Sequence, residues 1–133
     1  MFFSDMASGI IEYKLPGGWA VLAGKTDKDN DDLSLSKAGP NDWWFHVRGM
    51  AGSHVVLRVP SDIEPDRLTL ERAAAIAAYH SKARSGGVTP VSCTRVRYVT
   101  KLKGSKAGSV CIRKETVLKV RPEIPEPEFG NQE

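Results

Sequence analysis

The first hydrophobic positions of the chain form two short runs that are separated by a turn signal. Residues 10–15 alternate loosely between apolar and polar side chains, and residues 19–24 are mostly apolar. Pro16, Gly17 and Gly18 lie between the two runs, and these residue types favour tight turns. The pattern predicts two strands that are joined as an N-terminal β-hairpin.

A polar stretch that is dense in aspartate follows this hairpin, at residues 25–32. We expect this stretch to be a loop. A short helix is predicted after it, capped by Asn30 or Asp31 and ended before Gly39. This prediction rests on the preference of asparagine and aspartate for the N-cap position and of glycine for helix ends.

Two further strands are predicted in the middle of the chain, at residues 43–47 and 53–59. The first is rich in aromatic residues, which favour strands, and it places Trp44 and His46 on one side of the sheet. The opposite side of the same strand carries Trp43, Phe45 and Val47.

The clearest helical period lies between residues 66 and 86. Small apolar residues recur there at helical spacing, and the many alanines allow close packing against a sheet. Asp66 or Thr69 is the expected N-cap, and the pair Gly86 and Gly87 is the expected stop.

Three more strands are predicted in the last third of the chain, at residues 90–103, 109–113 and 116–121. Residues 104–108 contain two glycines and are predicted to be a hairpin loop. Strict alternation is lost near Arg95, so we expect a bulge or a sharp twist there.

This order of elements predicts an α+β fold with a mostly antiparallel sheet and one main alanine-rich helix packed on a face. Residues 1–121 are predicted to form one domain, since 133 residues with 41% hydrophobic and 26% charged side chains are ordinary for a globular chain. Residues 122–133 are rich in proline and glutamate, and we expect a disordered tail there.

The sequence carries no signal for a membrane or for secretion. No apolar run approaches the length of a membrane span, and the first residues have no basic flank and an acid in their apolar part. Cys93 and Cys111 do not make a disulfide framework, and two buried thiols are expected. A cytoplasmic protein is therefore predicted.

Basic residues are concentrated in one part of the chain. Residues 82–121 contain eleven Lys and Arg side chains and one acid, Glu115, so this segment carries +10 while the remainder carries −7. Lys and Arg that neutralise phosphates release condensed counterions, so this segregation indicates a surface for a polyanion. A solvated basic surface without a partner is the alternative.

Residues 42–54 are the densest in side chains that bind or react. In one interpretation, exposed Trp44 and the imidazoles of His46 and His54 stack on unpaired bases, while Arg48 and nearby backbone amides meet phosphate. This arrangement would form a recognition pocket for RNA.

Two other interpretations of these residues stay open. His46, His54 and Asp42 could bind a metal or perform acid–base catalysis, although this spacing matches no standard ligand set. Trp44 and the two histidines could instead be buried structural side chains, as we expect for Trp43 and Phe45. No phosphate-binding glycine loop, nucleophile elbow or zinc spacing occurs, so we predict no cofactor, no metal and no enzymatic activity.

Lys101, Lys103 and Lys106 can place three ammonium groups on one projecting hairpin. Lysines at a hairpin tip also protect sheet edges from aggregation, which is the structural alternative. Because these lysines belong to the +10 segment, phosphate contact is the favoured role.

Four motifs occur in a fixed order along residues 24–120. They are a glycine–lysine pair with a later Asn and Leu, an aromatic core followed by Gly-Ser-His, an alanine-rich helix ending in an aromatic and a serine, and a basic hairpin. Their positions are Gly24-Lys25, Asn30 and Leu33; Asp42, Trp44-Phe45-His46 and Gly52-Ser53-His54; residues 73–81; and residues 96–110. In these motifs the chain resembles the NFACT-R domain, the RNA-binding module of the NFACT proteins, which include ribosome-associated quality-control factors.

The resemblance implies a stand-alone RNA-binding domain, with tRNA and the large ribosomal subunit as partners. The residues expected to contact phosphate are Arg95, Arg97, Lys101, Lys103 and Lys106. The residues expected to form the adjoining pocket are Trp44, His46, Arg48, Ser53 and His54. A small histidine-dependent hydrolase or nucleotide-processing enzyme, and a protein-docking module that uses the basic face, are the two alternatives.

Overall fold

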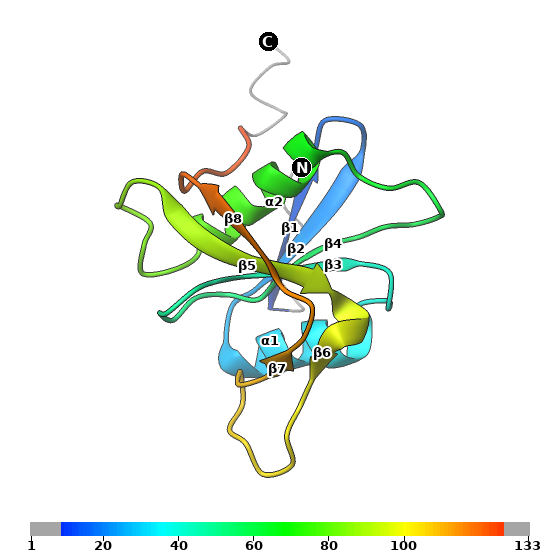
Figure 1. Cartoon of the computed structure of the whole chain (residues 1–133), viewed down its shortest axis with the longest axis vertical. Helices are drawn as coiled ribbons and strands as arrows, with labels where there is room; N and C mark the ends of the chain where they lie inside the picture. Colours follow the sequence, from blue (N-terminus) through cyan, green and yellow to red (C-terminus); the bar gives the residue numbers. More distant parts are fainter. Residues whose placement is uncertain (1–8, 127–133) are drawn as a thin grey trace.

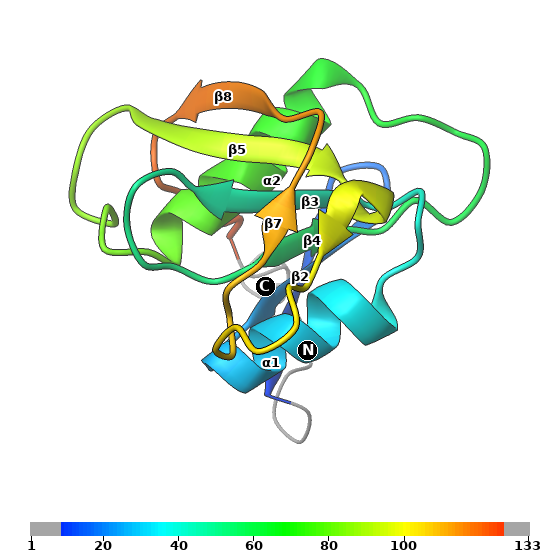
Figure 2. The ribbon, with the colours of Figure 1, turned by 60° about the horizontal axis from the view of Figure 1, so that its bottom comes forward.

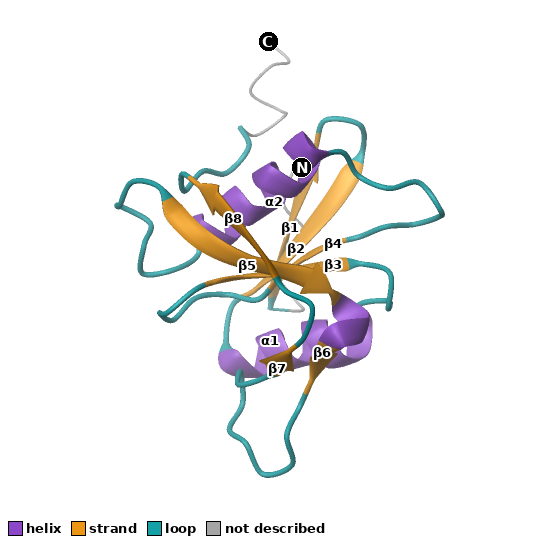
Figure 3. Ribbon diagram, viewed as in Figure 1, coloured by secondary structure: helices purple, strands orange, loops and turns teal. Residues whose placement is uncertain are grey.

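A six-stranded antiparallel sheet forms the centre of the computed structural model, which describes residues 9–126 (Figures 1 and 3). Every neighbouring pair of strands in it is antiparallel. The order across the sheet is β1 (Ile10–Leu15), β2 (Trp19–Gly24), β4 (Val55–Leu57), β3 (Trp43–Val47), β5 (Thr89–Arg95) and β8 (Thr116–Val120).

Helical segments cover both faces of this sheet. Helix α2 (Arg67–Tyr79) lies along one face, and helix α1 (Asp27–Asp32) continues into a π-helical turn, Leu33–Lys37, at the other (Figures 1 and 2). A two-stranded ribbon of β6 (Val99–Thr100) and β7 (Cys111–Ile112) joins this second layer. The predicted α+β class, with its antiparallel sheet and main alanine-rich helix, is confirmed.

The two sides of the sheet build separate apolar cores. Phe45 and Leu57 are fully buried among the alanines of α2, whereas Trp44 and Val56 pack with Leu33 on the opposite side. Neighbouring residues of a strand face opposite sides of a sheet, so Phe45 and Trp44 must enter different cores. The predicted facing of strand β3 is therefore confirmed.

The first helix begins earlier than predicted. Thr26, not Asn30 or Asp31, is the N-cap: its hydroxyl accepts from the Asp29 backbone N–H, and the Asp29 carboxylate accepts from the Thr26 N–H, both at 3.1 Å. This reciprocal capping box, with acids in the first turn, stabilises a helix through residues that were predicted to be a loop.

Helix α2 has the predicted N-cap but a different end. The Asp66 carboxylate accepts from the Thr69 N–H at 2.8 Å, yet the helix stops at Tyr79, well before Gly86. The C-cap residue, His80, leaves the helical conformation at φ −92° and ψ 42°, and its carbonyl accepts from the backbone N–H of Ser53 at 2.9 Å. The backbone of the neighbouring loop thus competes with a further helical turn.

Two predicted strands are shorter than expected. The strand at 53–59 is reduced to β4, and side chains bind the backbone on both sides of it: Asn30 accepts from the His54 N–H at 3.0 Å and the Asp42 carboxylate accepts from the Val59 N–H at 2.7 Å. The strand at 90–103 is broken after Arg95 by a 3₁₀ turn, Val96–Tyr98, and not by a bulge. This turn is where the chain leaves the main sheet and enters the β6–β7 ribbon.

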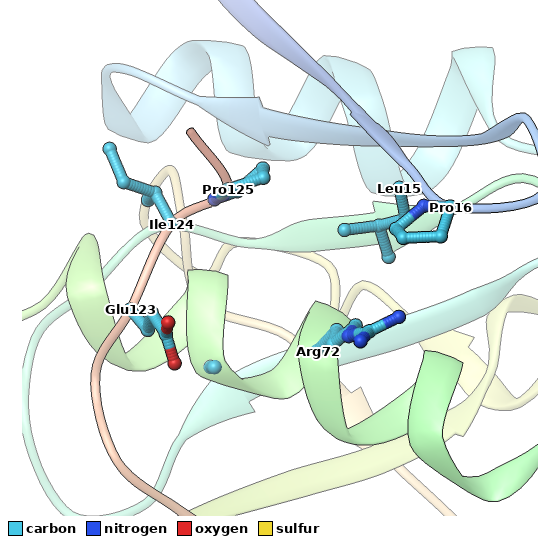
Figure 4. A pocket seen from close by; sticks show the side chains of 7 residues that line it. Leu15, Pro16, Arg72, Glu123, Ile124 and Pro125 are labelled. Atoms are coloured by element: carbon cyan, nitrogen blue, oxygen red, sulfur yellow. The ribbon is translucent and has the colours of Figure 1, made fainter. Parts of the chain in front are cut away.

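The first residues of the predicted tail lie along α2. The Glu123 N–H donates to the Ala75 carbonyl at 3.1 Å, and Ile124 packs on the α2 core. Figure 4 shows this segment across an apolar hollow of about 230 Å³ from Leu15 and Pro16. Residues 127–133, the rest of that tail, lie outside the described residues.

Both cysteines are free thiols, but only Cys93 is buried, and its burial raises the pKa of this thiol to about 12. Cys111 is exposed on strand β7, which corrects the expectation of two buried thiols. In residues 9–126 no helix has the length and apolar character needed to cross a bilayer.

Candidate nucleic-acid interface

The hairpin that follows β6 projects from the lower end of the molecule as drawn in Figure 1. Val99 faces the interior, where it packs with Leu33 and Ile112. Leu102, Lys103 and Lys106 are exposed in the loop between the two strands. The predicted hairpin is therefore present, and it carries two of its three lysines on the outside.

The third lysine, Lys101, is turned inward and braces the hairpin. Its ammonium group lies 3.0 Å from the Asp31 carboxylate and donates to the Ser109 carbonyl at 2.9 Å and to the Lys106 carbonyl. A charge that is paired in this way must lose its partner before it can bind phosphate. These contacts show that Lys101 holds the hairpin against α1. Contact between Lys101 and phosphate stays a prediction.

Gly108 anchors the returning strand of the hairpin to the rest of the domain. Its N–H donates to the Asp31 carboxylate at 3.0 Å, and its carbonyl lies 3.1 Å from His54 Nε2. Its φ of +87° belongs to the left-handed region that favours glycine. Asp31 therefore holds the hairpin twice, through Lys101 and through Gly108.

A chain of hydrogen bonds fixes the protonation of His54. The Trp44 indole N–H donates to Ser34 Oγ at 2.9 Å, which leaves the Ser34 hydroxyl hydrogen for His54 Nδ1 at 2.8 Å. Nε2 of His54 then carries the proton and donates it to the Gly108 carbonyl. Burial, followed by the charge of His46, lowers the pKa of His54 to about 4.

Trp44 and His54 therefore serve as buried connectors in this geometry. Trp44 is 3% exposed and His54 is 2% exposed. Neither ring presents a face on which a base could stack. The structural alternative is favoured for both of these residues.

His46 and Arg48 border an open groove between β3 and the hairpin. The groove has a volume of about 320 Å³, and Val110 and Ile112 form part of its apolar wall. The imidazole of His46 stacks on Trp44 with ring centroids 6.0 Å apart and planes at 20°. Burial lowers the pKa of His46, which favours the neutral ring.

Arg48 is held at the rim of this groove by an acid. Its guanidinium Nε lies 3.3 Å from the Glu115 carboxylate, which also accepts a hydrogen bond from the Ser92 hydroxyl. Arg48 and Glu115 are both partly exposed, so their attraction is weakened by solvent. The arginine is thus positioned at the groove while it stays accessible.

Ser53 lies apart from the groove, in a hydrogen-bond network that gives structural roles to the motif residues Gly24 and Asn30. Its hydroxyl donates to the Gly24 carbonyl at 2.5 Å, and the Asn30 side chain accepts from the His54 N–H at 3.0 Å. A Cβ on Gly24 would lie 2.2 Å from Asn30 Oδ1, so only glycine fits there. These residues join β2, α1 and β4.

Arg95 and Arg97 lie at the end of β5. The Arg95 guanidinium stacks 4.0 Å above the Trp43 ring and pairs with Glu64 at 2.6 Å. Arg97 donates to the Asn41 side chain and, over 3.4 Å, to the Pro40 carbonyl. Arg95 therefore has its charge paired, while Arg97 is exposed and bound only to neutral oxygens.

The catalytic alternative needs the Asp42 carboxylate to act with the histidines, and the structure shows it bonded to other groups. Both carboxylate oxygens of Asp42 are occupied, by the N–H groups of Gly39 and Val59 and by Arg58 at 2.9 Å. Residues 9–126 contain no group of three His, Cys, Asp or Glu side chains that could hold a metal ion.

Tyr98, Arg113 and Lys114 form a cationic–aromatic cluster that the sequence interpretation missed. The Arg113 guanidinium carbon lies 5.2 Å and the Lys114 ammonium 5.8 Å from the centre of the Tyr98 ring. Tyr98 precedes β6, and Arg113 and Lys114 follow β7. Because these residues are far apart in sequence, only the pairing of β6 with β7 brings them together. The sequence did carry one sign of this cluster, because Tyr98 lies between Arg97 and Lys101, which were both predicted to contact phosphate.

An α+β domain with a projecting basic hairpin beside an imidazole-lined groove is an architecture suited to polyanion binding. The chain belongs to the family described as the NFACT protein RNA binding domain, whose model matches residues 10–114.

The chain is similar to curated and solved relatives of this family. It is 38% identical to the Rqc2 homolog RqcH of Bacillus subtilis (strain 168) over 84% of this chain, and 34% identical to that of Streptococcus suis (strain 05ZYH33) over 80%. In each case it spans 19% of the relative. The C-terminal structure of the fibronectin/fibrinogen-binding protein from Streptococcus suis matches with a TM-score of 0.78 and 33% identity, covering 84% of this chain and 45% of that one.

Proposed function

We propose that this chain binds RNA, with tRNA or ribosomal RNA of the large subunit as the target, in ribosome-associated quality control or translation. The family that the chain belongs to is described by RNA binding, and two relatives are named as Rqc2 homologues. The role proposed for this chain is that of a binding domain in the cytoplasm, without a reaction of its own.

The observation that carries the proposal is the unpaired positive charge of the hairpin. Within residues 9–126, Lys103 and Lys106 have no carboxylate within ion-pair distance, and both are exposed. The brace of Lys101 and the anchor at Gly108 hold these two ammonium groups on a fixed backbone. Charges that are unpaired and preorganised bind phosphate at a lower cost in ordering.

The groove beside the hairpin supports the same proposal. His46 offers a neutral ring edge, and Arg48 offers a guanidinium at the rim. We propose that an unstacked base enters this groove while the hairpin lysines contact the adjoining phosphates. Proteins recognise RNA mostly through such unpaired nucleotides.

Fluorescence anisotropy with labelled tRNA tests the proposal. The parent chain should bind with an affinity that falls steeply between about 50 and 200 mM salt, since each phosphate contact releases counterions. Changing Lys103 and Lys106 together to alanine should weaken binding and lower the slope of log K against log salt by about 1–2.

The matched control also removes two positive charges, but from helix α2 on the other face of the sheet. Arg67→Ala with Arg72→Ala changes two exposed positions of α2 and should leave affinity and slope near those of the parent. If the hairpin and control variants bind equally, the hairpin does not contact the RNA. Crosslinking in cells, followed by sequencing of the attached RNA, would identify the target. Protein partners that stay bound to the chain after nuclease treatment of a lysate would instead favour the protein-docking alternative.

A further inference from the structure

The β6–β7 ribbon carries a second feature with a shape and charge suited to RNA, at the end opposite to the lysine loop. Tyr98 directly precedes β6, and Arg113 directly follows β7. The two residues are joined by a hydrogen bond from the Arg113 N–H to the Tyr98 carbonyl at 3.1 Å. The Tyr98 ring is half-buried, so part of it is open to solvent.

The cations around this ring are not neutralised by acids. In the described part of the chain, neither Arg113 nor Lys114 has a carboxylate within ion-pair distance, and nor does Arg97, which precedes Tyr98 in sequence. All three of these basic side chains are exposed. Two positive charges, those of Arg113 and Lys114, therefore lie over one aromatic ring, and Arg97 adds a third next to Tyr98 in the chain.

The backbone holds this arrangement in an unfavourable conformation. Lys114 has a φ of +56°, and it is the one non-glycine residue with a positive φ among residues 9–126. The Thr94 hydroxyl faces the turn and donates to the Arg113 carbonyl at 2.7 Å, with the Lys114 carbonyl at 3.3 Å. Left-handed backbone at a lysine is uncommon, and strain of this kind is concentrated at functional sites.

We infer that Tyr98, Arg113 and Lys114 form a binding site for one unpaired nucleotide, in which the base stacks on Tyr98 and the two cations contact its flanking phosphates. An aromatic ring with neighbouring arginine or lysine is the arrangement that single-stranded nucleic acids use, because every base has a face that can stack. A base inside a duplex cannot reach the ring. The site therefore selects RNA with unpaired segments over continuous helix.

This inference rests on the proposed RNA binding and adds the class of RNA that is preferred. It also assigns a contact to the base of the hairpin, in addition to the lysines at its tip. An RNA strand that engages both would run along the ribbon, past Cys111, which is exposed between them.

The test compares single-stranded and duplex RNA of one sequence by anisotropy, with the parent and two variants at Tyr98. The parent should bind the single strand more tightly than the duplex. Tyr98→Leu, which keeps apolar volume and removes the aromatic face, should weaken single-strand binding about fivefold or more and duplex binding less than about twofold. Tyr98→Phe should bind like the parent, because no hydrogen bond of the Tyr98 hydroxyl occurs among residues 9–126.

Two further measurements separate binding from stability. Tyr98→Leu should keep the salt slope of the parent, whereas Arg113→Ala with Lys114→Ala should lower the single-strand slope by about 1. Lys114→Gly removes the amine and relieves the strained backbone, so it should weaken single-strand binding without a loss of thermal stability.

The outcomes distinguish this inference from the proposed function. If the parent binds RNA and Tyr98→Leu binds the single strand as tightly as Tyr98→Phe does, the stacking site is wrong and RNA binding stands. If the folded parent binds neither RNA, both the function and the site are overturned.

Discussion

His54 donates its Nε2–H to the backbone carbonyl of Gly108 over 3.1 Å, although the two residues are 54 positions apart in sequence. This bond joins the central sheet, through the residue that precedes β4, to the hairpin that carries Lys103 and Lys106. The imidazole thus acts as a positioning group for a surface that it does not itself reach.

Replacement of His54 should destabilise the protein more than replacement of its neighbour His46. His54→Ala leaves the Ser34 hydroxyl and the Gly108 carbonyl without their partner in a buried site, at a cost of about 2–4 kcal/mol in the free energy of unfolding. Urea unfolding gives this difference, and hydrogen exchange of the hairpin amides should accelerate. His46→Ala, at a half-buried position in the groove, is the control; equal losses would contradict the connector role.

The stability of the protein should fall as the pH drops from about 6.5 to about 4. Burial lowers the pKa of His54 from 6.5 to about 4, so within this window the unfolded chain binds a proton that the folded chain does not. The free energy of unfolding then rises with pH by up to about 1.4 kcal/mol per unit, or about 3 kcal/mol for this group over the window. Above pH 6.5 this contribution is fully present.

Urea titrations at several pH values between 4 and 7.5 measure this dependence, with His54→Gln as the comparison. The variant should show a shallower dependence, because one titrating group has been removed. A residual slope should persist, since burial also lowers the pKa of His80 to about 4. An unchanged slope in the variant would show that His54 titrates alike in both states.

Local alternation was sufficient to predict that Trp44 and Phe45 of strand β3 face opposite sides of the sheet. Trp44 and Phe45 are neighbours in sequence, so their opposite facing follows from strand geometry alone. The capping box of Thr26 and Asp29 was also encoded locally, but the density of aspartate in that stretch suggested a loop instead.

The pairing of charges could not be predicted in this way. Lys101 and Asp31 are 70 positions apart, and only the folded sheet brings the hairpin against α1. Arg95 meets Glu64 for the same reason, through contacts between distant segments. Basic segregation along the sequence therefore indicated a polyanion surface, but it could not separate the paired cations from those that stay unpaired.

Lys101 and Lys103 should respond differently to the same substitution. Lys101→Ala removes the brace to Asp31 and to two hairpin carbonyls, so it should lower stability by about 1–3 kcal/mol. Lys103→Ala changes an exposed side chain and should alter stability by no more than about 0.5 kcal/mol, while it weakens RNA binding and lowers the salt slope by about 1. Thermal unfolding and anisotropy on the same preparations would separate the two effects. Equal losses of stability would show that the ion pair at Lys101 contributes nothing.

Gly104 and Gly108 offer a matched pair for testing the anchor of the hairpin. Their φ values are nearly equal, +85° and +87°, so an alanine at either position is strained to a similar extent, at about 1–2 kcal/mol. A Cβ at Gly104 would meet open space, whereas a Cβ at Gly108 would lie 2.9 Å from the Asp27 carboxylate. Gly108→Ala should therefore cost about 1 kcal/mol more than Gly104→Ala, because the Asp27 carboxylate must turn away and the Asp27 Cβ, 3.2 Å from the new methyl group, is crowded. Urea unfolding of the two variants measures this difference directly.

RNA affinity should fall in Gly108→Ala and remain near that of the parent in Gly104→Ala, since only the substitution at Gly108 displaces the returning strand of the hairpin from Asp31 and His54. Equal stabilities of the two variants would mean that the hairpin is not anchored at Gly108.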